Sequence, residues 1–138
     1  DGDVVTANEQ LGYPYSLSGV VVKGDQLGRT LGYPTANIGG IDPFKLIPAD
    51  GVYVVHVELK EGGFGGMLYI GERPTLKNPE PQRSVEVNIF GLERDLYGEV
   101  ITVRFLERVR GDMRFDGLDA LKRQMQQDEA FARQRLGR

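Results

Sequence analysis

Cysteine is absent from this chain of 138 residues, and histidine occurs once, as His56. Without cysteine the chain can form no disulfide, no zinc–thiolate site and no thiol nucleophile. A single histidine excludes a metal site built on several histidines, and it allows a Ser-His-Asp triad only if His56 takes part. A lack of cysteine also fits a reducing compartment, so we expect a cytoplasmic protein.

Long apolar runs and a strong excess of one charge are missing too. No run approaches the ~20 apolar residues that a membrane-spanning helix needs, and the acidic, polar start of the sequence does not look like a signal peptide. The 17 basic and 20 acidic residues give a net charge of −3, whereas a nucleic-acid-binding face is usually basic. We therefore expect neither a membrane nor a nucleic acid as partner.

Glycine is abundant, with 19 residues, and it separates short runs that are typical of β-strands. Several runs alternate apolar and polar residues: in one of them Val85 and Val87 would face one side of a sheet and Glu86 the other. The runs cover residues 17–24, 51–59, 65–72, 83–91 and 99–109. The glycine-rich residues 59–66 look like a hairpin connection between two of them.

Only the last segment has apolar residues near helical spacing. We expect a helix there with Asp116 as its N-cap and Gly137 as its stop, and Asp128 within it should pair with a nearby arginine or cap a backbone group. A short helix over residues 3–11, capped by Asp3, could precede the strands. Short strands followed by one helix predict a mainly β fold, with a closed antiparallel barrel and the C-terminal helix packed outside.

The stretch "GRTLGYPTANI", residues 28–38, combines glycines and a cation with two oxygen-bearing side chains. Thr35 and Asn37 would point the same way on an extended segment, and their oxygens are hard ligands that Mg²⁺ accepts beside phosphate oxygens. Arg29 suits phosphate as well. The alternative is a glycine-rich turn whose side chains bond their own backbone, and composition alone favours this alternative.

Two further places carry side chains that could take part in catalysis or binding. Glu86, in the middle of an expected strand, could serve as a general base, or it could simply be solvated. Arg110, Met113 and Phe115 precede the helix and would suit a flat aromatic ligand, although Phe115 could equally fasten the helix to the barrel. Taken one at a time, the structural alternatives prevail.

Taken together, the motifs resemble the riboflavin kinase family from about Leu11 to Leu136. "GRTLGYPTANI", "DGVYVV", "YIGERPT", "VEVNIF", "DLYGE" and "RFDGLDALKRQMQQDEAFAR" follow in that family's order and spacing. The resemblance implies a six-stranded antiparallel barrel of Greek-key type with a C-terminal helix outside. It also implies Mg²⁺-assisted transfer of the γ-phosphoryl group of ATP to the ribityl 5′-hydroxyl of riboflavin, giving FMN and ADP.

The resemblance also implies roles for single residues. Glu86 would be the catalytic base, and Thr35 and Asn37 would hold Mg²⁺ and the nucleotide phosphates. The nucleotide side would further include Gly24, Gly28, Arg29, Thr30, Ile89 and Tyr97. The flavin side would include Arg110, Met113 and Phe115. The sequence departs from the family pattern at Asn88, where many members have histidine, and at Asp112 and Met113.

The start of the chain resembles the junction after the adenylyltransferase domain of bifunctional bacterial FAD synthetases. We therefore expect residues 1–12 to be a linker remnant or short helix, residues 13–138 to be the kinase domain, and the adenylyltransferase domain to be its partner in the parent protein. The isolated module should be a monomer. Because His56 stands alone, there is no His-x-Gly-His motif, and we expect FMN but not FAD as product.

Two other functions stay open. A flavin-binding barrel without catalysis would need neither a base nor a metal ligand, so Glu86, Thr35 and Asn37 separate it from a kinase. The second is a kinase that phosphorylates another alcohol or uses another nucleotide.

Overall fold

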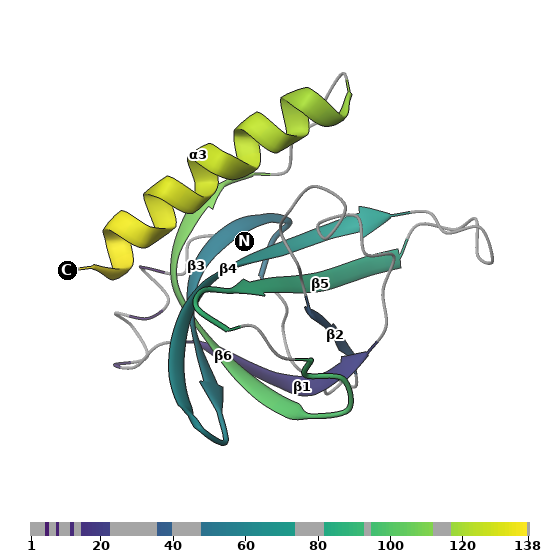
Figure 1. Ribbon diagram of the computed structural model, residues 1–138, viewed down its shortest axis with the longest axis vertical. Helices are drawn as coiled ribbons and strands as arrows, with labels where there is room; N and C mark the ends of the chain where they lie inside the picture. The colour runs from purple at the N-terminus through teal and green to yellow at the C-terminus, as the bar shows by residue number, and fades with distance from the viewer. Residues whose placement is uncertain are drawn as a thin grey trace.

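Six antiparallel strands form a closed barrel, and one long helix lies outside it in the part of the chain that the computed structural model describes (Figure 1). The described residues are Val5, Asn8, Gly12, 15–22, 36–39, 48–73, 82–92, 95–111 and 117–137. The elements are β1 (Ser16–Val22), β2 (Ala36–Gly39), β3 (Gly51–Leu59), β4 (Gly62–Arg73), β5 (Gln82–Ile89), β6 (Val100–Arg110) and α3 (Leu118–Leu136). The predicted fold class is confirmed.

The strands follow one another around the barrel in the order β1-β2-β5-β4-β3-β6. Strands β3, β4 and β5 are neighbours in sequence and in space, and β6 returns to pair with β3, which is the Greek-key arrangement. The β3–β4 connection predicted from the glycines is a tight hairpin, because Leu59 pairs with Gly62 across the turn. The glycines that follow belong to strand β4 itself.

The inner faces of the strands form the core of the barrel. Tyr53 and Phe105 are fully buried there, with their rings edge to face at a centroid distance of 5.2 Å. The alternation predicted for residues 83–91 is confirmed, because Val85 and Val87 belong to this inner cluster. Every second side chain is therefore left to the outer face.

A second, smaller apolar cluster lies between α3 and the outer faces of the strands. Val54 of β3, Met67 of β4 and Ala132 of α3 are buried in it. A Cβ atom on Gly65 would lie 2.6 Å from Cδ1 of Leu136, so bare backbone on β4 lets the end of the helix sit close to the barrel. The helix can thus cover the outer faces of β3 and β4.

The two ends of α3 test the boundary predictions. The helix starts after Gly117, whose φ of 135° favours glycine, so the prediction of Asp116 as N-cap is wrong: the glycine backbone makes the entry into the helix. Gly137 ends the helix as predicted, and its N–H donates to the carbonyl of Arg133 at 3.0 Å.

The first residues of the chain are fastened to the barrel by Asn8. Its side-chain amide donates to the carbonyl of Phe105 at 2.7 Å, and its side-chain oxygen accepts from the N–H of Tyr15 at 2.6 Å. Val5 and Asn8 are both helical, in line with the expected short helix; its predicted cap, Asp3, lies outside the described residues.

We expect Phe105→Ala to lower the free energy of unfolding by about 3–5 kcal/mol, because it leaves a cavity beside Tyr53 in the inner core. Urea denaturation followed by circular dichroism measures the loss. Val100→Thr, at a position that is 68% exposed on the same strand, is the control and should change the value by less than about 0.5 kcal/mol. Equal losses in the two variants would contradict this account of the core.

Candidate active site

Three polar side chains from three strands stand in a row on the outside of the barrel. Asn37 of β2 pairs directly with Glu86 of β5, which pairs in turn with Tyr69 of β4. Residues directly opposite each other in an antiparallel pair project on the same face. This face is the outer one, because the alternate residues of all three strands line the inner core. We call Asn37, Glu86 and Tyr69 the outer row.

Glu86 is buried, with 4% of its surface exposed, although it lies on the outer face. The solvated alternative raised by the sequence is therefore wrong. Burying a carboxylate costs free energy unless its surroundings compensate, so glutamate is an unusual occupant for a strand position of this kind. Its burial in the middle of a strand gives the carboxylate a fixed place in the barrel wall.

Tyr69 flanks Glu86 on the side of α3. Its ring packs against the outer apolar cluster, and its hydroxyl lies over the bare backbone of Gly71, at the place that a Cβ atom there would take. Gly71 pairs with Ser84, which precedes Glu86 by two residues on β5. The tyrosine thus runs along the outer face next to the carboxylate, a neighbour that no sequence pattern indicates.

Asn37 and Tyr97 flank the end of β1. Asn37 pairs with Val22 on one side of this strand. On the other side the N–H of Gly98 donates to the carbonyl of Val21 at 2.9 Å, which holds the turn carrying Tyr97 in place. Tyr97 is 59% exposed. Two residues predicted for the nucleotide side therefore lie next to the point where the chain enters the glycine-rich segment 23–35.

The side chains of Ile89 and Arg110, two further predicted site residues, do not stand in the outer row, and their roles stay predictions. The side chain of Ile89 is 8% exposed and belongs to the inner core. Arg110 stands opposite Val52, which stands opposite Tyr69, so its backbone continues the line of the outer row. Its guanidinium, however, is bound by Asp128 of α3, which confirms the arginine partner predicted for that aspartate.

His56 also lies on the outer face, away from the outer row. Its Nε2 is 2.9 Å from Glu58 Oε1, and the guanidinium of Arg104 lies 3.0 Å from the same oxygen. These partners give the histidine a structural role on the outer face of the barrel. Among the described residues there is no group of three or more His, Cys, Asp or Glu side chains placed to hold a metal ion.

The oxygen donors of the outer row suit a hard cation that keeps most of its shell as water and phosphate oxygens, because such a cation needs few protein ligands.

A model of the family described as "Flavokinase: Riboflavin kinase" matches residues 11–136. The chain belongs to the riboflavin kinase family.

The chain has relatives that are longer proteins. It is 38% identical over 133 residues to the bifunctional riboflavin kinase/FMN adenylyltransferase of Bacillus subtilis, covering 96% of the chain and 42% of that protein. It is 41% identical over 140 residues to the protein of the same description from Escherichia coli, covering 99% and 43%. The chain thus spans about two fifths of the length of these relatives.

Solved structures resemble the chain as well. Riboflavin kinase from Trypanosoma brucei matches with a TM-score of 0.60 and 27% identity, over 91% of this chain and 81% of that one. A Streptococcus pneumoniae structure described as a macrolide-efflux protein matches with a TM-score of 0.86 and 41% identity, over 96% and 43%. Within the described residues, no helix has the length and apolar character to cross a membrane.

Several predicted site residues of the chain lie outside the described residues. On the nucleotide side these are Gly24, Gly28, Arg29, Thr30 and Thr35, and on the flavin side Met113 and Phe115. Their roles stay predictions. The described part of the site is the outer row with its continuation to Arg110 and the turn that carries Tyr97.

Proposed function

We propose that this chain transfers the γ-phosphoryl group of ATP to the ribityl 5′-hydroxyl of riboflavin, giving FMN and ADP. Membership of the riboflavin kinase family supports the reaction class. The observation that carries the proposal is the register that sets buried Glu86 opposite Asn37 on the outer face. A flavin carrier would need neither a buried carboxylate there nor an oxygen ligand beside it.

We assign Glu86 the role of general base. As the 5′-oxygen attacks the γ-phosphorus, a new P–O bond forms, the bond from phosphorus to the bridging oxygen of ADP breaks, and the proton of the hydroxyl passes to the carboxylate. Phosphoryl transfer depends mainly on positioning and charge neutralisation. A base in the middle of a strand, in a wall closed by hydrogen bonds, is placed as rigidly as that requires.

Asn37 would hold Mg²⁺ together with Thr35, the residue before β2. The bound ion would neutralise charge on the phosphates of ATP. The amide of Asn37 carries a neutral oxygen, and Asn37 pairs directly with Glu86. Neighbouring strands can therefore supply a ligand for the cation and a base. Arg29, Thr30 and the glycines of the segment before β2 would complete the phosphate side, and Tyr97 would lie near the nucleotide.

We also propose that residues 13–138 form the kinase domain and that, in a longer parent protein, an adenylyltransferase domain precedes it. The bifunctional relatives support this organisation. Residues 1–12 would then connect the two domains. The bonds of Asn8 to Phe105 and Tyr15 favour a connection that packs on the barrel over one that hangs free.

Glu86→Gln should lower kcat for FMN formation by about 10²–10⁴-fold, because the amide keeps the shape of the side chain but cannot take the proton. The measurement is FMN production from riboflavin, ATP and Mg²⁺, separated by chromatography. Glu58→Gln, at a half-exposed position on the outer face of β3, is the control and should keep the wild-type rate. A wild-type chain that binds riboflavin but makes no FMN would support the flavin carrier instead.

Asn37→Ala should raise the Mg²⁺ concentration needed for half-maximal rate by about 10-fold, which corresponds to about 1.4 kcal/mol of lost binding. Titration of the rate with Mg²⁺ at saturating riboflavin measures it. Ser18→Ala, which removes an exposed hydroxyl bonded to Thr102, is the matched control. An Asn37→Ala titration that superimposes on the wild type would remove Asn37 from the proposed ligands.

The chain of 138 residues should form no FAD from FMN and ATP, since its single histidine cannot supply a His-x-Gly-His motif. Incubation under conditions that give full conversion of riboflavin to FMN tests this. Appearance of FAD would show that a second nucleotide-transfer site exists on this chain.

A further inference from the structure

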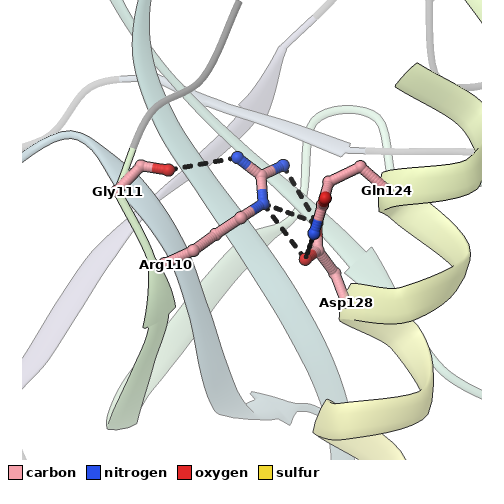
Figure 2. Close-up of polar contacts among 4 residues, drawn as sticks. All are labelled: Arg110, Gly111, Gln124 and Asp128. Atoms are coloured by element: carbon pink, nitrogen blue, oxygen red, sulfur yellow. Dashed lines mark hydrogen bonds and ion pairs between the residues drawn. The ribbon is translucent and has the colours of Figure 1, made fainter. Parts of the chain in front are cut away.

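The guanidinium of Arg110 is clamped between helix α3 and the end of β6 (Figure 2). Its Nε donates to Oδ1 and Oδ2 of Asp128 at 3.1 and 3.0 Å, and its Nη2 lies 2.9 Å from Oδ2. Its Nη1 donates to the carbonyl of Gly111 at 3.1 Å. The amide of Gln124 donates to Oδ1 of Asp128 at 3.0 Å and so holds the carboxylate in turn.

This ion pair is buried, with 14% of the arginine side chain and 3% of the aspartate side chain exposed. A two-point contact between a guanidinium and a carboxylate fixes their relative orientation, whereas a single-point contact leaves that orientation variable. Buried ion pairs add little net stability compared with apolar side chains of the same volume. What this pair does supply is a definite position for the chain at Gly111.

The backbone around Arg110 is shaped for the same contact. Gly51 has a φ of 150°, and a Cβ atom on it would collide with the carbonyl oxygen of Arg110, so only glycine lets β3 come this close. The pairing of β3 with β6 shifts register at two places before it reaches Arg110. Leu106 and Val109 consequently both pack in the outer cluster, which regular alternation would forbid.

Arg110 and Glu86 are joined through the sheet. Arg110 pairs with Val52, Val52 with Tyr69, and Tyr69 with Glu86. The end of β6 is therefore held in a fixed relation to the outer row. The next residues along the chain, 112–116, contain Met113 and Phe115, which the sequence predicts for the flavin side.

We propose that Asp128, acting through Arg110, is a positioning residue for riboflavin: the pair holds Gly111, and with it the end of β6, in a fixed relation to Glu86. The inference rests on the proposed function. It gives Arg110 a role in addition to the predicted flavin contact, because its Nε, Nη1 and Nη2 groups all contact the protein itself.

The test is riboflavin binding to the intact chain, measured by flavin fluorescence without ATP and followed by steady-state kinetics. Asp128→Asn and Arg110→Lys should each raise the Kd and the KM for riboflavin by about 10- to 100-fold, a range typical of small misplacements near a site. The KM for ATP should stay within about 2-fold, and Asp128→Glu, which keeps the carboxylate, should recover part of the loss.

Glu107→Gln is the matched control, since it breaks the 2.9 Å pair with Arg135 between the same strand and the same helix. It should leave the Kd for riboflavin unchanged. Thermal melts followed by circular dichroism establish that each variant is folded at the assay temperature. A folded Asp128→Asn that binds riboflavin like the wild type would overturn the proposal, because loss of stability alone does not move the Kd of folded protein.

The other results are equally decisive. If Arg110→Lys weakens binding and Asp128→Asn does not, Arg110 contacts the flavin directly and the positioning role is wrong. If the wild type binds riboflavin without making FMN and the variants still bind it weakly, the positioning role stands and the proposed reaction fails. If the wild type makes FMN and both variants match it in KM, the reaction stands and the positioning role fails.

Discussion

The alternation of inward and outward side chains around a closed antiparallel barrel is the constraint on which the rest of this structure depends. The inward residues fill a core that admits only one register, because a slip of one residue would exchange Glu86 with Val85 or Val87. That same register aligns Asn37, Glu86, Tyr69, Val52 and Arg110 across five strands. The apolar core thus decides where the polar groups of the site lie.

Two buried carboxylates show two uses of this framework. Asp128 faces a guanidinium and an amide, so its charge is matched by groups that also fix its orientation. Glu86 is held in the wall of the barrel between Asn37 and Tyr69. Asp128 joins α3 to the end of β6, whereas Glu86 stands opposite Asn37, the proposed metal ligand. The proposed division of roles follows this difference.

Fold and chemistry are separate matters here. The family model and the bifunctional relatives place the chain in the riboflavin kinase family. A barrel of this kind specifies a shape, and the chemistry depends on the side chains that it carries. The proposed function therefore depends on the outer row, where the buried carboxylate of Glu86 stands opposite Asn37.

Much of the fold could be read from local patterns. The alternation in residues 83–91, the glycine-rich hairpin, the terminal helix and its stop at Gly137 all depend on neighbours in sequence. The predicted start of the helix is wrong, because an aspartate before a helical pattern suggests an N-cap even when the cap is the next residue, here Gly117. Glu86 stays a predicted site residue, and its burial cannot be known from the sequence, because a mid-strand glutamate has the same sequence pattern when it is solvated.

What the sequence determined by itself was the order of five strands and the terminal helix, the alternation of apolar and polar residues in several strands, and the family motifs; strand β2 was not among the predicted runs. Only the tertiary structure decided that Asn37 stands opposite Glu86, that Tyr69 flanks it, and that Arg110 is bound by Asp128. The physical reason is that strand register and the position of a helix on the barrel are set by packing between residues far apart in the chain. The local spacing of residues does not encode this packing.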